Sequence, residues 1–270
     1  MEQYIGLWKR ASIQLGEGNP FENATVYWLQ AETYFADIRI PFNQPLLSQP
    51  LLSLDRESLL PFAEINAFAG AIDCTETWIR WNRRIDFKPS SDIDQGKVHF
   101  VGVDLIEQGE SVVDGKIETY TEIWQPQPIE QGDRLVLELV RGVNLTTQVV
   151  SHPQGLWVTV GDHTIRLCDN RGYAADFVAP EPSKLSEVEL KHLMQFQADY
   201  SQHKYNQDSH KSSWETMLSS DPNRMGSQLI PPTQVRDGVL VEIEEQASGE
   251  TIEYHWAIRE AAGNLIMPDI

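Results

Sequence analysis

The sequence predicts a mainly β protein built from two similar antiparallel, barrel-like halves, each with one short helix. Short strand-like segments bounded by Gly or Asp turn signals recur at near-regular spacing, which is typical of sandwiches and barrels. In addition, four landmarks of the first half return in the second half in the same order. We therefore expect one half at residues 1–130 and another at residues 131–270.

The strand-like segments are rich in β-branched and aromatic residues, many of them in alternation with polar ones. We expect strands at residues 24–30, 33–40, 75–87, 97–106, 116–124 and 134–141. The first two are separated by a short turn, which predicts a hairpin. In the third, alternation predicts that Trp81 and Arg83 share a face with Ile85 and Phe87.

Two segments have helical spacing of their apolar residues. Residues 54–68 predict one helix, in which Pro61 must lie near the start or cause a kink. Residues 185–200 predict the other, and Ser186 with Glu189 has the pattern of an N-terminal capping box.

The order of the landmarks predicts an internal duplication. The pairs are separated by 129, 127, 128 and 132 residues, and they are Trp28 and Trp157, Arg39 and Arg166, Phe68 and Phe196, and Trp124 and Trp256. The Pro- and Gln-rich stretch at residues 125–133 is the most linker-like part of the chain, so we place the boundary there.

The tripeptide Gly-Leu-Trp occurs at residues 6–8 and again at 155–157. Lipocalin-type barrels, of the calycin class, use Gly-x-Trp on a first strand to seal the closed end, with an arginine over the indole. An ordinary core tryptophan beside a turn glycine explains the same letters. We use the repeat only as support for a barrel.

The chain is strongly acidic, with 21 basic and 40 acidic residues and a formal charge of −19. Such a surface repels phosphate backbones and anionic lipid headgroups, so we expect no nucleic-acid and no membrane partner. Cys74 and Cys168 do not form a disulfide framework, and the N-terminus shows no secretory signal. These features predict a cytoplasmic protein and leave a small molecule as the partner class.

Neither a metal nor a cofactor is expected. Glu189 and His192 have a Glu-x-x-His spacing, but a di-metal carboxylate site needs a second such pair, which the sequence lacks. The stretch at 203–210 has no zinc-site spacing. Standard catalytic signatures are also absent, so we assign no catalytic residue.

Charged residues on the inner strands are the candidate binding groups. Asp37 and Arg39 are two apart and so point to one face, where they form either a ligand site or a structural ion pair; the recurrence of an arginine at Arg166 favours the structural role. Arg83 shares its face with Trp81 and suits a carboxylate ligand, or else it is satisfied by a buried acidic residue.

Several stretches resemble the fungal Hri protein family and its bacterial relatives. The matching residues are Phe68, Ala69 and Gly70 before a Trp-bearing strand, and residues 122–126, "EIWQP", at the close of the first half. The resemblance implies a two-part β-barrel fold related to lipocalin-like barrels, with no settled enzymatic activity and no catalytic residues to carry over. The stretch "ADIRIP" is more typical of the bacterial members.

The best functional hypothesis is a lipocalin-like binder of a small, partly apolar ligand that carries a carboxylate. The candidate ligand-binding residues, all in the first half, are Tyr34, Arg39, Trp81, Arg83, His99 and Tyr120. One alternative is an enzyme in the same barrel, with His99 as general base beside Arg39 or Arg83. Another is a protein-interaction scaffold without a pocket, which would expose an apolar patch.

Overall fold

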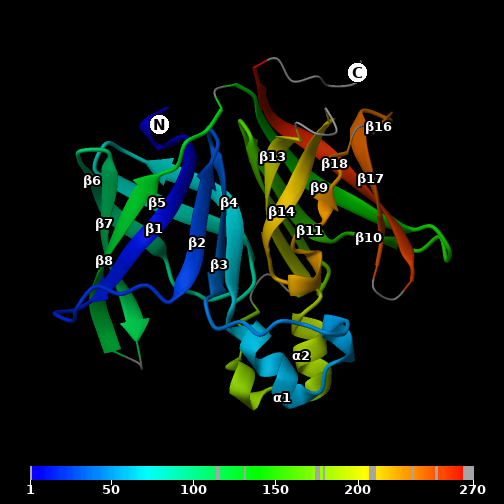
Figure 1. Cartoon of the computed structure of the whole chain (residues 1–270), viewed down its shortest axis with the longest axis horizontal. Coiled ribbons are helices and arrows are strands. Elements are labelled where there is room, and N and C mark those ends of the chain that lie inside the picture. The colour runs from blue at the N-terminus through cyan, green and yellow to red at the C-terminus, as the bar shows by residue number, and fades with distance from the viewer. Residues whose placement is uncertain are drawn as a thin grey trace.

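The computed structural model describes residues 2–113, 116–130, 132–173, 177–178, 180–206, 211–232, 234–246 and 249–263. Two antiparallel sheets lie side by side, and the helices lie beneath them at the same end (Figure 1). The first sheet closes into a barrel, whereas the second curls without closing. The mainly β fold of two barrel-like halves is thus confirmed.

The first sheet is an eight-stranded meander in which each strand pairs with the next one in sequence. Its last strand pairs back with the first, which closes the barrel and leaves no unpaired edge. The strands are β1 (Gly6–Leu15), β2 (Ala24–Gln30), β3 (Tyr34–Pro41), β4 (Asn66–Cys74), β5 (Trp78–Asp86), β6 (Asp94–Val101), β7 (Asp104–Val113) and β8 (Lys116–Pro126).

The second sheet repeats this meander but stays open. Its strands are β9 (Arg134–Asn144), β10 (Val150–Ser151), β11 (Gln154–Val160), β12 (His163–Asp169), β13 (Phe196–Asn206), β14 (Lys211–Ser219), β15 (Gln228–Leu229), β16 (Gln234–Arg236), β17 (Val239–Glu245) and β18 (Thr251–Ala262). The order is β15-β14-β13-β12-β11-β9-β18-β17-β16, with β10 paired to β9. Within the described residues β15 and β16 do not pair, and the sheet is open there.

The helical segments are shorter than the sequence predicts. The α-helices are α1 (Arg56–Leu59) and α2 (Glu187–Leu193), and the 3₁₀ turns are η1 (Glu2–Tyr4), η2 (Leu51–Ser53), η3 (Leu60–Glu64), η4 (Pro182–Lys184) and η5 (Pro222–Arg224). The capping box of Ser186 and Glu189 is confirmed. The predicted helices at 54–68 and 185–200 are too long, because β4 and β13 take their last residues. In the described residues, none of the helices has the length and apolar character to cross a membrane.

The predicted strand at 97–106 is also wrong, because it is a hairpin rather than one strand. β6 ends at Val101 and β7 begins at Asp104, and the turn between them contains Gly102 with φ +65. Glycine adopts this left-handed conformation without the Cβ penalty of other residues. The turn matters for the site, because it places β6 and β7 side by side as antiparallel strands of the barrel wall.

Strand register relates the two sheets position by position. In the first sheet Trp28 lies opposite Asp37, and in the second Trp157 lies opposite Arg166. Arg166 therefore occupies the position of Asp37, not that of Arg39 as the spacing of the landmarks suggested. The two sheets carry opposite charges at this equivalent position.

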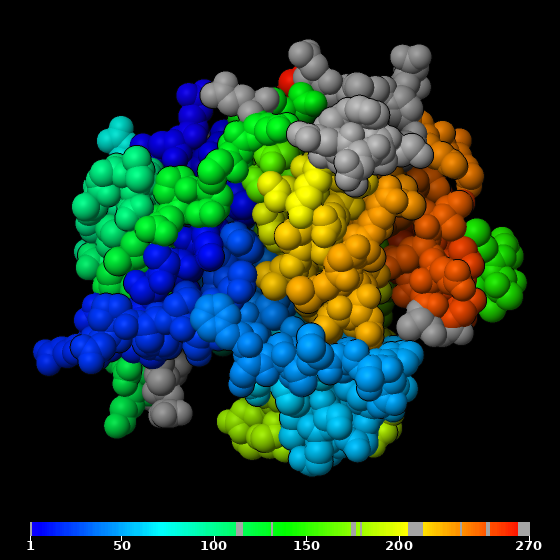
Figure 2. Space-filling model, viewed as in Figure 1, coloured from blue at the N-terminus to red at the C-terminus, as the bar shows by residue number. Residues whose placement is uncertain are grey.

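A single apolar core joins the two sheets. Strands β2 to β4 face β11 to β13, and apolar residues from both sheets and from the helical segments are buried between them. Aromatic rings cross the contact: the centroids of Tyr27 and Tyr200 are 4.7 Å apart, and those of Phe87 and Phe196 are 5.5 Å apart. In Figure 2 the segment before α1 lies against the second half of the chain. The backbone carbonyl of Gln49 in this segment accepts a hydrogen bond from the side-chain amide of Asn223 at 3.3 Å.

Arg171 connects the second half of the chain to the end of β5. Its side chain is 4% exposed, and its guanidinium donates to the carbonyl of Phe87 at 2.8 Å and to that of Asp86 at 2.7 Å. Asp169 balances its charge at 2.8 Å. A buried guanidinium with these partners fixes the position of one half against the other.

Arg171→Ala should therefore destabilise the whole chain. Losing the cation leaves Asp169 without its partner and two carbonyls without donors, and breaking such a buried pair costs about 3 kcal/mol. Urea denaturation followed by circular dichroism measures the free energy of unfolding. The exposed Arg141→Ala is the control, with a loss of about 0.5 kcal/mol or less. An equal effect of both changes would contradict this role.

Candidate functional site

One end of the closed barrel is filled by aromatic side chains. The indole of Trp28 stacks on Trp8 at 6.0 Å and meets Trp81 and Trp124 edge-on at 5.6 and 5.8 Å between ring centroids. The indole N–H of Trp8 donates to the carbonyl of Tyr4 at 2.8 Å. This cluster packs the barrel interior like a protein core.

The other end of the barrel contains a cavity of about 400 Å³. This volume lies within the range of small-molecule sites. In β3, β5 and β8 the inward side chains change from aromatic to charged toward this end, from Phe35 to Arg39, from Trp81 to Arg83 and from Trp124 to Glu122. The lining residues are Ile13, Arg39, Arg83, Ser90, Asp92, Ile93, Asp94, Gln95, Glu107, Glu110, Ser111, Ile117, Tyr120 and Glu122.

A β-bulge in β5 directs Arg83 into this cavity. Ile85 pairs with Ala69 and Arg83 pairs with Gly70, so Arg84 is the extra residue between them. A Cβ on Gly70 would lie 2.0 Å from the carbonyl oxygen of Asn82, so only glycine fits here.

The bulge also changes which residues share a face. Trp81 and Arg83 point into the barrel, whereas Ile85 and Phe87 join the core between the sheets. The prediction that all four share one face is therefore wrong, because strict alternation stops at the extra residue.

Arg39 and Asp37 form an ion pair inside the barrel. The Nε of Arg39 donates to Asp37 at 2.7 Å, and Glu122 lies 3.8 Å from the same guanidinium. The pairing expected from their shared face is confirmed. Although burial opposes the charge, the two carboxylates raise the pKa of Arg39, so it remains a cation. Burial raises the pKa of Asp37, against the effect of Arg39.

Arg83 is also paired with carboxylates. It donates to Asp94 at 2.6 and 2.9 Å and to Asp86 at 3.1 Å. Its guanidinium carbon lies 3.5 Å from the ring centroid of Phe68. Of the two interpretations of Arg83 drawn from the sequence, the one with acidic partners describes its contacts in this structure. The stacking and the ion pairs hold the guanidinium in one place.

Glu107 has no arginine among its hydrogen-bond partners. One of its oxygens accepts from the hydroxyl of Tyr120 at 2.7 Å, and the other accepts from the indole of Trp124 at 3.0 Å. The side chain is 4% exposed. Burial raises the pKa of Glu107 well above its ordinary value, and repulsion by Glu122 and Asp94 adds to this effect.

Two glycines make room for Glu107 and Tyr120. A Cβ on Gly96 would lie 2.7 Å from the side chain of Glu107, and one on Gly109 would lie 2.5 Å from the ring of Tyr120. Glycine inside a strand often marks such a close approach. These glycines are the sequence signal by which Glu107 could have been found.

The structure brings three of the six predicted site residues together, because Arg39, Arg83 and Tyr120 line the cavity. Trp81 does not line the cavity and belongs to the aromatic cluster at the other end of the barrel. Tyr34 and His99 do not reach the cavity, which corrects their placement in one pocket with the others.

The reason is strand alternation. Tyr34 precedes the inward Phe35, so it faces outward, where the guanidinium of Arg84 lies 5.5 Å from its ring centroid. His99 follows the inward Val98 and is exposed.

Sequence reasoning missed Asp94, Glu107 and Glu122, which lie on strands whose pairing it did not predict.

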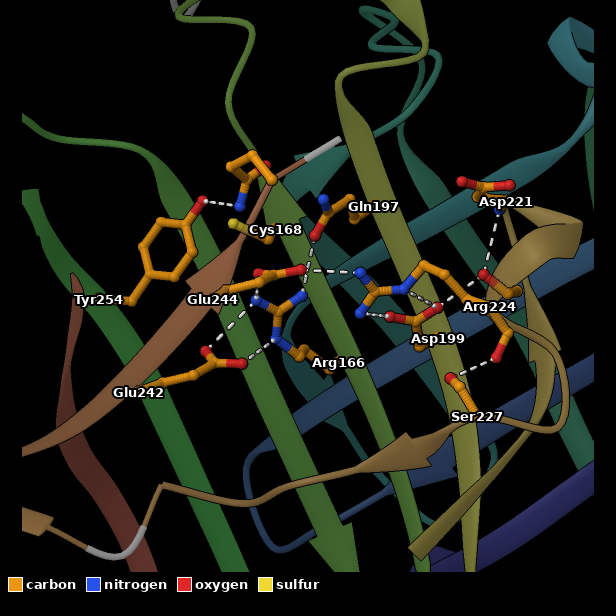
Figure 3. A network of polar contacts seen from close by, with 12 residues as sticks. Arg166, Cys168, Gln197, Asp199, Asp221, Arg224, Ser227, Glu242, Glu244 and Tyr254 are labelled. Atoms are coloured by element: carbon orange, nitrogen blue, oxygen red, sulfur yellow. Dashed lines mark hydrogen bonds and ion pairs between the residues drawn. The ribbon is translucent and has the colours of Figure 1, made fainter. Parts of the chain in front are cut away.

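The second sheet has its own buried arginine, Arg166. Arg166 lies between Glu242 and Glu244 at 3.2 and 2.8 Å and also donates to Gln197 (Figure 3). Three aromatic rings surround it at about 6 Å, those of Trp157, Tyr254 and Trp256. These contacts agree with the structural role that the sequence favoured for Arg166.

Arg224 extends this network across the open side of the sheet. Its guanidinium joins Asp199 on β13 to Glu244 on β17, at 2.8 and 2.7 Å (Figure 3). In the first sheet, backbone pairing of β5 with β6 closes the barrel between its fifth and sixth strands. In the second sheet, side-chain ion pairs link the strands on the two sides of the opening.

Arg39→Ala should lower the stability of the barrel. It leaves the carboxylate of Asp37, which is 2% exposed, without its nearest cation, at a cost of about 3 kcal/mol. Chemical denaturation measures this loss. The double variant Asp37→Asn with Arg39→Ala should recover part of it, because no buried charge then lacks a partner. A single variant as stable as the wild type would show that the pair is not structural.

Glu107→Gln should change how stability depends on pH. A carboxyl whose pKa is raised by folding favours the native state while it is protonated, and it loses that contribution as pH rises from its ordinary value of 4.5 to its folded value. The wild type should therefore lose stability relative to Glu107→Gln as pH rises above about 4.5. Denaturation curves between pH 4 and 8, with the exposed Glu76→Gln as control, would detect this. A constant difference across that range would contradict it.

Comparison with known proteins places the chain in a family. The family model for Protein HRI1 matches residues 6–260. The crystal structure of the uncharacterized protein YLR301w from Saccharomyces cerevisiae is similar, with a TM-score of 0.53 and 15% identity over 94% of this chain and 98% of that one. At this identity the likeness shows the fold alone.

No curated protein sequence matches the chain. The solved structure is that of a yeast protein, so the bacterial character suggested by "ADIRIP" stays a prediction. The resemblance to the fungal Hri proteins, however, is confirmed, because the family model extends over nearly the whole chain. The protein belongs to the HRI1 family.

Proposed function

We propose that the protein binds a small, partly apolar molecule in the cavity of the first barrel, at the end opposite the aromatic cluster. The observation that carries this proposal is the combination, in one cavity of about 400 Å³, of a buried polar floor and exposed isoleucines at the rim. A few convergent polar groups in a concave apolar setting are typical of ligand sites.

The rim includes isoleucines beside exposed polar residues. Ile93 is 59% exposed and Ile117 is 73% exposed, and Ile13 lies near them in the lining. Exposed isoleucines lose contact with water when an apolar group covers them, which favours binding. The floor, by contrast, offers Tyr120 and charged groups, so a bound molecule needs a polar head as well as an apolar part.

The floor is also preorganised. Arg39 and Arg83 are held by Asp37, Asp94 and Glu122, and Tyr120 is held by its hydrogen bond to Glu107. Side chains already fixed in the unliganded protein lose little conformational entropy when a ligand binds. The closed antiparallel meander supports a lipocalin-like binder, and we keep the cytoplasm as its proposed location.

The enzyme alternative is weaker on geometry. It requires His99 beside Arg39 or Arg83, but His99 is exposed on the outer face of β6, and the described cavity lining contains no histidine. The scaffold alternative requires an exposed apolar patch, and Phe100, Val101 and Val103 are exposed at the β6–β7 turn. Those residues do not line the cavity, so the scaffold alternative leaves the cavity without a role.

A blocked cavity tests the proposal. Ser111→Trp places a large ring in the lining, whereas Gln108→Trp places the same ring on the exposed face of the same strand. A library of alkyl carboxylates, alkylamines, alkanols and tetrapyrroles should contain molecules that raise the melting temperature of the wild type. A ligand at a hundred times its dissociation constant stabilises by about 2.7 kcal/mol, which corresponds to about 5 °C here.

We expect the same shift in Gln108→Trp and none in Ser111→Trp. Equal shifts in both variants would place the binding elsewhere on the molecule. If no compound of the library raises the melting temperature of the wild type, the proposal is wrong.

A further inference from the structure

We infer that the cavity receives the cationic head of its ligand, a primary amine or a similar small ammonium group, with Glu107 as the acceptor. This inference rests on the proposed function and names the chemistry of the ligand at the same site. It replaces the carboxylate head that Arg83 suggested in the sequence.

The arginines of the cavity are already occupied by the protein's own carboxylates. Each of the three guanidinium nitrogens of Arg83 donates one hydrogen bond to Asp94 or Asp86, so the protein's own carboxylates balance its charge. Arg39 is held in the same way by Asp37 and Glu122. A carboxylate ligand that took over these bonds would displace one of the protein's carboxylates, which would then lose its partner at a large cost.

The lining is also acidic in balance. It contains two arginines, Arg39 and Arg83, against four other carboxylates, which are Asp92, Asp94, Glu110 and Glu122, and the carboxyl group of Glu107. An anion brought among these groups meets net repulsion, whereas a cation is attracted. Charges in a partly buried cavity act more strongly than on an open surface, because water screens them less.

Glu107 is the carboxyl group best placed to receive the cation. Asp94 is paired with Arg83 at 2.6 Å and Glu122 with the buried Arg10 at 2.5 Å, whereas Asp92 and Glu110 are exposed. Glu107 is buried and accepts one neutral hydrogen bond at each oxygen. A carboxylate has about four lone-pair positions, so each oxygen can still accept a bond from an ammonium group.

The surroundings of Glu107 are consistent with this role. Asp94 faces it from β6, Tyr120, Glu122 and Trp124 from β8, and Arg39 from β3. The two acids and burial raise the pKa of Glu107, and Arg39 alone does not reverse their effect. An ammonium group bound beside it favours the carboxylate form, so ligand binding releases the proton of Glu107 to solvent.

The apolar part of the ligand then extends toward the mouth. Ile13, Ile93 and Ile117 line the cavity, and the last two are largely exposed. An alkyl chain attached to the amine would cover them while its head reaches the floor. The ligand class is therefore an amphiphilic amine rather than a free cation.

Three probes of equal chain length test this inference on the unmodified protein. They are n-octylamine, octanoate and octanol, each titrated by calorimetry at pH 6. We expect octylammonium to bind at least about tenfold more tightly than octanoate, as expected for the pairing of a buried charge. Titrations in two buffers with different ionisation enthalpies should show proton release on binding of the amine.

Glu107→Gln then tests the acceptor. The matched control is Glu76→Gln, an exposed residue at the end of the barrel that the aromatic cluster fills. Glu107→Gln should weaken octylammonium by about tenfold or more and abolish proton release, while octanol binding stays unchanged. Glu76→Gln should change neither. If Glu107→Gln does not fold, the three-probe comparison still decides the head group.

Two failures are distinguishable. If octanoate or octanol binds as tightly as octylammonium, or if octylammonium binds Glu107→Gln normally, the cationic head is wrong while the cavity remains a binding site. If none of the three probes binds, the proposed function itself fails.

Discussion

Pairing of buried charges is the constraint on which both sheets depend. A charged group taken out of water needs an opposite charge within reach, because an unpaired one costs several kcal/mol, about 3 or more. Register places Asp37 in the first sheet where the second has Arg166. Each sheet satisfies its own charge: Arg39 joins Asp37, whereas two glutamates from β17 join Arg166. Both sheets must pair a buried charge, but they use different partner residues, so the side chains in their interiors differ.

This difference separates the surroundings of the two buried charge clusters. In the closed barrel the aromatic cluster fills one end, and the ion pairs lie around a cavity at the other. In the open sheet the guanidinium of Arg166 lies among Trp157, Tyr254 and Trp256, with carboxylates on its remaining side. Charges there hold strands together across an opening, and charges in the barrel surround a space.

Sequence periodicity predicted much of the fold and part of the site. Alternation of side chains identified the strands and placed Arg39 on an inward face, since a residue two positions from Asp37 must share its face. The same rule separates Tyr34 from Arg39, so their grouping in one pocket was avoidable. The bulge at Arg84 was not predictable from alternation, because an inserted residue changes the face of everything after it. Glu107 was missed because its role depends on the pairing of β7 with β6 and β8, which one strand cannot show.

The core between the sheets has a consequence for how such a chain can arise and change. By register, Ala36 and Ile38 in β3 correspond to Ile165 and Leu167 in β12, and all four lie in one apolar cluster. Equivalent faces of the two halves thus bury each other, as the two identical patches of a symmetric dimer do. The chain has the form of a homodimer whose subunits have been joined end to end. A substitution on this face in one half must therefore be accommodated by the corresponding face of the other, so the two halves are bound to evolve together.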